Sequence, residues 1–153
     1  MLKAEDFLIR EMIVKGMIGP ADVERAKAEL TAQDESIVAR LVGQNVISGR
    51  DVAMIRALVC EVPFVDLDHF EIDIRNASLL PKSIAETHEA FPLFDMERGV
   101  VVGMTDPLNF RGLDQIRQRI RRNVDAVLCD PEALGKLITR AYRHAYARHE
   151  PPV

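Results

Sequence analysis

The side chains that most often bind metals or move protons are sparse in this sequence. The two cysteines, Cys60 and Cys129, form no C-x-x-C pair, and neither stands at zinc-ligand spacing from a histidine. His144 and His149 are five residues apart on a predicted helix. That spacing sets them about 140° apart around the helix axis, a poor geometry for one shared metal. We therefore assign no metal ligand and no catalytic residue to the histidines, which are His69, His88, His144 and His149.

Motifs that hold phosphate or activate a nucleophile are also missing. Gly43 and Gly49 are one residue too far apart for a phosphate loop, and Arg50-Asp51 follows them in place of Lys-Ser/Thr. No G-x-S-x-G elbow occurs. We therefore expect this chain not to be an enzyme by itself. The acidic pairs fall in predicted loops or caps, where we interpret them as solvated surface: Glu5-Asp6, Asp34-Glu35, and Asp66 with Asp68.

The densest charge is the basic segment Arg117-Gln118-Arg119-Ile120-Arg121-Arg122. Arginines in such a cluster bind phosphates or an acidic patch. No aromatic side chain is interleaved to stack on bases, and the net charge of the chain is −4, which argues against nucleic acid. Three interpretations stay open: a solvated helix end, an acidic protein partner, and nucleic acid or lipid. Under the second, Arg117, Arg121 and Arg122 are the candidate partner-facing residues.

The composition is that of an ordinary folded domain. Apolar residues make up 48% of the 153 positions, enough for a core, and the N-terminus lacks the apolar segment of a signal peptide. No apolar run approaches the ~20 residues that span a bilayer. We expect a cytoplasmic protein with two buried, reduced cysteines. Charge is uneven: residues 1–75 hold 9 basic and 14 acidic residues, whereas residues 109–149 hold 9 basic and 4 acidic residues.

The first 60 residues contain an internal repeat with an offset of 29 residues. Each copy predicts a helix, a turn and a second helix, which makes two helical hairpins. The matched positions are Leu8-Ile9 with Ile37-Val38, Met12-Ile13 with Leu41-Val42, Met17-Ile18 with Val46-Ile47, Asp22-Val23 with Asp51-Val52, and Ala28 with Ala57.

The turns of the two copies carry equivalent signals. Gly16 and Asn45 hold the same repeat position, and these two residue types best tolerate the left-handed conformation that ends a helix. The second helix of the first copy is predicted to begin with Pro20 in its first turn. The second helix of the other copy is predicted to begin with Ser48 as its cap.

The second half changes to a mixed pattern of order α-β-β-α-β-α. A helix broken at Leu80-Pro81 is followed by a hairpin, a helix, a third strand and a last helix. The fold class is therefore α+β, with an all-α front half and a three-stranded sheet behind it. The expected division is a helical repeat subdomain at 1–62, an extended connector at 63–75, an α+β subdomain at 76–148, and a tail or linker start at 149–153. The expected strands are 90–96, 100–104 and 124–129, and the expected helices are 76–87, 109–122 and 131–147.

These features resemble the MshEN domain, the N-terminal module of type II secretion and type IV pilus assembly ATPases, which includes type II secretion system protein E. That family repeats the motif R-L-G-x-x-L-V-x-x-G-x-I-x-x-x-x-L-x-x-A-L-x-x-Q in tandem. The similarity continues through Pro63-Phe64-Val65-Asp66-Leu67, Leu80-Pro81 and Thr105-Asp106-Pro107-Leu108.

In part of this family the tandem repeat binds the bacterial messenger cyclic di-GMP, but the matching positions of this chain differ. The motif's arginines fall on Phe7 and Ser36, and its final glutamines fall on Leu30 and Val59. The resemblance therefore implies little affinity for the messenger, because arginine supplies the planar fork that binds a guanine edge or a phosphate. The opening glycines fall on Ile9 and Val38, whose side chains are expected to block the approach of a ligand. Asp106 matches a position that can lie near the ligand, and it is equally explained as a turn former.

Three hypotheses follow from the resemblance. The leading one is a non-catalytic docking and regulatory domain that links a secretion or pilus ATPase to a cytosolic segment of an inner-membrane assembly protein. Such a domain contacts the membrane only through that partner and needs no cofactor. The alternative is a divergent receptor for cyclic di-GMP or another nucleotide. The third is a structural or oligomerising element without a ligand.

Overall fold

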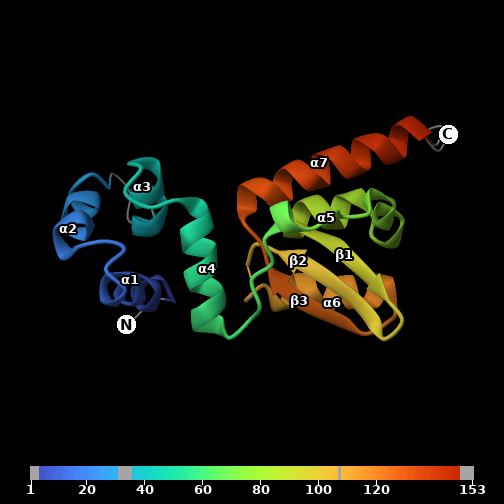
Figure 1. Cartoon of the computed structure of the whole chain (residues 1–153), viewed down its shortest axis with the longest axis horizontal. Coiled ribbons are helices and arrows are strands. Elements are labelled where there is room, and N and C mark those ends of the chain that lie inside the picture. The colour runs from blue at the N-terminus through green and yellow to red at the C-terminus, as the bar shows by residue number, and fades with distance from the viewer. Residues whose placement is uncertain (1–3, 31–35, 107, 149–153) are drawn as a thin grey trace.

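The computed structural model describes residues 4–30, 36–106 and 108–148, and the predicted tail at 149–153 lies outside these ranges. A helical half and a sheet-containing half lie on either side of one helix, α4 (Figure 1). Helices precede a three-stranded sheet in the chain, which confirms the α+β class.

The helical half consists of two hairpins that bury equivalent positions in one core. These hairpins are α1 (Ala4–Val14) with α2 (Pro20–Ala28), and α3 (Ile37–Gly43) with α4 (Gly49–Cys60). Helix α1 packs on α3 and α4, and α2 packs on α3. The repeat read from the sequence therefore predicts which side chains are buried together. The buried pairs related by the repeat are Ile9 with Val38, Met12 with Leu41, Ile18 with Ile47, Val23 with Val52, and Ala26 with Ile55.

The helix ends follow the predicted turn chemistry. Gly16 and Asn45 both adopt left-handed backbone conformations, with φ of 72° and 59°. Pro20 occupies the first turn of α2, and the amide of Gly19 donates to Asp22 Oδ2 at 2.8 Å. At the equivalent place in the second copy, the amide of Asp51 donates to Ser48 Oγ at 3.0 Å. Each copy thus satisfies a backbone group at the start of its second helix.

The sheet half has the predicted order α-β-β-α-β-α. Strand β2 pairs antiparallel with β1 and parallel with β3, so the strand order is β1-β2-β3. A bulge interrupts the register between Pro92 and Phe94. The elements in order are two 3-10 turns, η1 (Leu67–His69) and η2 (Ile74–Leu79), then α5 (Lys82–His88), β1 (Ala90–Met96), β2 (Gly99–Met104), α6 (Phe110–Ile120), β3 (Val124–Leu128) and α7 (Pro131–Arg148).

Both faces of the sheet are buried. Strand β1 begins with four consecutive buried residues, 90–93, and consecutive side chains of a strand point to opposite faces. Phe91 meets Tyr142 of α7 edge-to-face, with ring centroids 5.8 Å apart. The Tyr142 hydroxyl donates to the Leu80 carbonyl at 2.6 Å, which fixes α7 to the segment before α5. The sheet half therefore has its own core, separate from that of the helical hairpins.

Helix α4 contributes to both halves. Its Val52 and Ile55 lie in the helical core, whereas Ala53 and Ala57 pack against Leu128 of β3. The chain after α4 then pairs with the same strand. The Val65 amide donates to the Leu128 carbonyl at 2.9 Å, and the Leu128 amide donates to the Pro63 carbonyl at 2.8 Å. The start of the segment predicted as a connector is thus bound to the edge of the sheet.

The left-handed turn of the first hairpin predicts a difference between two glycine substitutions. No atom would obstruct a Cβ at Gly16 or at Gly43, but only Gly16 has a positive φ. Gly16→Ala should therefore lower the free energy of unfolding by about 1–2 kcal/mol, from backbone strain alone. Gly43→Ala, within α3, should leave it unchanged or raise it by up to about 1 kcal/mol. Urea unfolding measures both, and equal losses in the two variants would contradict the backbone assignment.

Candidate functional site

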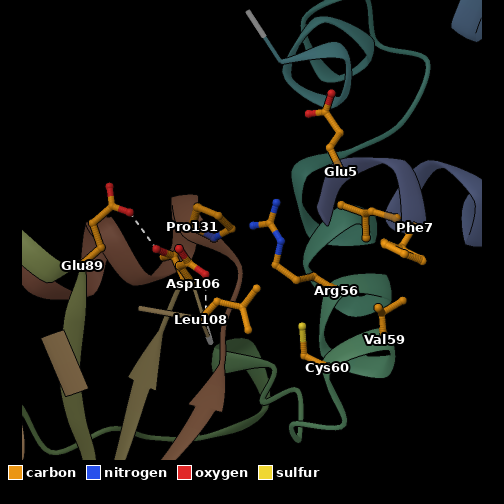
Figure 2. A pocket seen from close by; sticks show the side chains of 11 residues that line it. Glu5, Phe7, Arg56, Val59, Cys60, Glu89, Asp106, Leu108 and Pro131 are labelled. Carbon is orange, nitrogen blue, oxygen red and sulfur yellow. Dashed lines mark hydrogen bonds between the residues drawn. The ribbon is translucent and has the colours of Figure 1, made fainter. Parts of the chain in front are cut away.

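Helix α4 presents a third face between the two that it buries. At 100° per residue, Arg56 and Cys60 lie between the face of Val52 and the face of Ala53. That sector points into the space between α1 and the end of the sheet (Figure 2). Any residue there must face both halves of the molecule.

A cleft of about 500 Å³ occupies this position. It is bounded by α1 and α4 on one side, and on the other by the segments at the C-terminal end of β2 and the start of α7 (Figure 2). The lining residues are Glu5, Phe7 and Leu8 from α1, Arg56, Val59 and Cys60 from α4, and Glu89, Thr105, Asp106, Leu108 and Pro131 from the sheet half.

Three large apolar side chains of the cleft are left uncovered. Phe7 is 49% exposed, Val59 is 42% exposed and Leu108 is 50% exposed. They come from α1, from α4 and from the loop after β2, so the fold gathers them from both halves. A set of exposed apolar side chains around a hollow is typical of a surface that binds another molecule.

Three carboxylates line the same cleft, and each accepts hydrogen bonds from its own surroundings. Glu5 accepts from the Ile37 amide at 2.9 Å and from the Ser36 hydroxyl, which joins α1 to the start of α3. Glu89 accepts from the Thr105 hydroxyl at 2.7 Å. Asp106 accepts from the Leu108 amide at 2.9 Å. These bonds hold the carboxylates in place without neutralising their charge.

Arg56 is the one basic residue among those that line the cleft. Among the residues that the structure describes, its guanidinium has no ion pair and no hydrogen bond. Its side chain extends from α4 toward Pro131, with Glu5 above it (Figure 2). The cleft therefore combines apolar walls, an acidic majority and a single cation without a partner.

The structure brings some of the sequence-predicted positions together and separates others. Phe7, Val59 and Asp106 all line the cleft, although 99 residues separate the first from the last. Leu30 and Ser36, the other two positions that match the family's arginine and glutamine, are not among its lining residues. Asp106 forms the turn expected of it. The other interpretation, that Asp106 lies near a ligand, stays a prediction.

The structure places Ile9 and Val38 in the core, and their effect on a ligand stays a prediction. Both were expected to block the approach of a ligand, but neither lines the cleft. Apolar side chains at these positions pack the helices together.

The three candidate arginines lie at the opposite end of β2 from the cleft. Arg122 pairs with Asp95 at 2.5 Å and also donates to the Met96 carbonyl. Arg117 donates to the Val124 carbonyl at 3.4 Å, and Arg121 ends α6 in a left-handed conformation. Arg117 and Arg122 therefore form hydrogen bonds to β-strand residues and are also exposed. The partner-facing role of all three arginines stays a prediction.

The two cysteines differ in environment. Cys60 lines the cleft, whereas Cys129 is buried beside Gly103. Burial raises the pKa of the Cys129 thiol to about 12, and the carboxylate of Asp130 adds to the shift. Among the described residues, no three side chains of His, Cys, Asp or Glu gather to hold a metal ion, and no helix is long and apolar enough to cross a membrane.

Comparison with known proteins identifies the family. The profile of the MshEN domain matches residues 60–147, which is more than half of the chain. The chain belongs to the MshEN domain family. It is 20% identical over 138 residues to the type IV pilus assembly ATPase PilB of Pseudomonas aeruginosa, and 23% identical over 137 residues to PilB of Myxococcus xanthus. Each alignment covers 90% of this chain and 24% of the relative, so the chain spans about a quarter of the length of these ATPases.

Two solved structures share this fold, one of MshE and one of XpsE. The structure of MshE with cdg, an abbreviation for cyclic di-GMP, superposes with a TM-score of 0.71 at 18% identity, covering 92% of this chain and all of the other. The N-terminal domain of XpsE superposes with a TM-score of 0.64 at 16% identity, covering 92% and 97%. The MshEN fold is thus retained while the sequence has diverged widely.

Sequence reasoning missed Arg56, although a signal was present. The MshEN motif has a leucine three positions before its final glutamine, and this position falls on Lys27 in the first copy and on Arg56 in the second. A cation in place of a leucine in both copies marks a departure from the motif. The two cations differ in position: Lys27 pairs with Glu24 at 3.7 Å, whereas Arg56 lines the cleft.

The cysteine environments predict selective alkylation. At pH 8, iodoacetamide should modify Cys60 in the folded domain and leave Cys129 unmodified, because a buried thiol with a pKa of about 12 forms almost no thiolate there. Both should react in urea. Mass spectrometry of the intact chain measures the adducts, and modification of Cys129 at the rate of Cys60 in the folded state would contradict the packing around Gly103.

Proposed function

We propose that this MshEN domain binds a protein segment in the cleft between its two halves. The segment belongs to a cytosolic part of an inner-membrane assembly protein, so that binding ties a secretion or pilus assembly ATPase to its machine. The observation that carries the proposal is the exposure of Phe7, Val59 and Leu108 around one hollow. Such side chains stabilise a complex by about 25 cal/mol for each Å² of apolar surface removed from water.

The charges of the cleft favour a protein segment over a dinucleotide. Cyclic di-GMP carries two phosphates, and three carboxylates face the cleft against one guanidinium. Phe7 and Val59 stand where the family motif has an arginine and a glutamine, so the polar groups that would bind guanine are replaced by apolar ones. A peptide can bring apolar side chains to these positions without bringing phosphate charge.

A second candidate function is reception of cyclic di-GMP in the same cleft. It is supported by the superposition on MshE with cdg and by the position of Phe7 and Val59 inside the cleft. Under this candidate, a messenger would lie beside these two positions in a chain that kept the motif residues. The two candidates compete for one site, so they can be separated by direct titration.

Docking is tested by two neighbouring substitutions on α4. Val59 and Leu58 are both exposed, but only Val59 lines the cleft. Val59→Asp in the full-length ATPase should reduce co-purification of its inner-membrane partner at least about tenfold, because a charge at the centre of an interface must be desolvated. Leu58→Asp should leave it unchanged. Quantitative mass spectrometry of affinity-purified membranes measures the ratio, and loss with Leu58→Asp alone would place docking on the opposite face of α4.

The messenger hypothesis is tested by calorimetry. Titration of the purified domain with cyclic di-GMP should release no binding heat, because bidentate arginine contacts worth about 1–3 kcal/mol each are missing. A related MshEN domain with both repeats intact serves as the positive control. Saturable binding in the micromolar range by this chain would contradict the docking interpretation and favour a messenger receptor.

A further inference from the structure

The unpaired guanidinium of Arg56 points to the chemistry of the segment that the cleft accepts. Arg56 is partly buried between α1 and the start of α7, yet it has no ion pair and no hydrogen bond with any described residue. Exposed arginines commonly lack a partner, but this one lies inside a hollow with apolar walls. Water there is partly excluded, so an ionic partner gains more from pairing than it would on open surface.

The carboxylates nearest in the cleft leave Arg56 available. Glu5 is committed to the start of α3 through the Ile37 amide and the Ser36 hydroxyl. Glu89 and Asp106 belong to the opposite wall and also form no ion pair among the described residues. One wall therefore offers an unpaired cation and the other offers unpaired anions. Leu108 and Pro131 lie between them, whereas Phe7 and Val59 lie on the other side of Arg56 (Figure 2).

We propose that the docked segment carries charges in the complementary order. An apolar side chain lies against Phe7 and Val59, an aspartate or glutamate pairs with Arg56, and beyond Leu108 a lysine or arginine faces Glu89 and Asp106 (Figure 2). This inference rests on the proposed docking function and adds the pattern that the partner must carry. A carboxylate suits Arg56 because both of its oxygens can accept from the planar guanidinium.

The alternative occupants fit this arrangement less well. A ligand with phosphates could reach Arg56, but its remaining charge would face Glu5, Glu89 and Asp106. A purely basic segment would leave Arg56 facing a like charge, and a purely acidic one would meet the anionic wall. Only a segment of mixed charge satisfies both walls, which makes Arg56 the residue that selects for partner orientation.

The test begins with a photo-cross-linker inside the cleft. Phe7 is replaced by p-benzoylphenylalanine in the full-length ATPase, because a half-exposed position leaves room for the added benzoyl group. Irradiation of native-host membranes and sequencing of the cross-linked peptide identify the docked segment. The proposal expects an acidic residue beside the cross-linked position and a basic residue farther along the segment in the same direction.

Charge reversal then tests Arg56 itself. Arg56→Glu should lower the cross-link yield at least about tenfold. Replacing the acidic residue of the identified segment by arginine should restore it. Lys27→Glu is the matched control, because Lys27 holds the equivalent repeat position and does not line the cleft. Urea unfolding of each variant verifies that the fold is intact.

The outcomes separate this inference from the docking function. Loss with Arg56→Glu, no loss with Lys27→Glu and rescue by the partner substitution support the charge pattern. A cross-link that is insensitive to Arg56→Glu, or a segment without an acidic residue, overturns the pattern and leaves docking intact. Absence of any cross-link from position 7 overturns docking in the cleft together with the inference.

Discussion

Packing of helix α4 into two cores is the constraint on which the rest of the structure depends. Val52 and Ile55 are buried with the helical hairpins, and Ala53 and Ala57 are buried against Leu128 of the sheet. The alanines matter because small side chains let the helix axis approach the strand closely. One rigid helix thereby sets the position of the first hairpin relative to the end of the sheet, and the cleft is the space that this arrangement leaves.

The chemistry of the cleft follows from that geometry. The sector of α4 between its two buried faces cannot be covered by either half, so Arg56 and Cys60 remain accessible. Opposite them stands the C-terminal end of β2, where the chain turns at Thr105 and Asp106. Loops at the end of a strand are free to vary because they contribute little to the core, which is why such ends often carry binding residues.

The likeness to other MshEN domains separates scaffold from site. The fold is kept at 18% identity, in line with the tolerance of a core for substitution when volume and pattern are kept. Ile9 and Val38 belong to this scaffold, whereas Phe7 and Val59 belong to the cleft. The second pair is exposed, so its side chains can change without disturbing the core.

Local signals in the sequence were sufficient to predict the repeat, the left-handed turns at Gly16 and Asn45, and the order of strands and helices. Each of these features depends on residues that are neighbours in the chain. The family motif also pointed to Phe7, Val59 and Asp106 one by one. Only the tertiary structure decided that these three face one cleft, that Ile9 and Val38 are core residues, and that Arg56 beside them has no ion pair or hydrogen bond with any residue that the structure describes. The reason is that periodicity shows which face of a helix is apolar, but which neighbour covers each face depends on contacts between residues far apart in the chain.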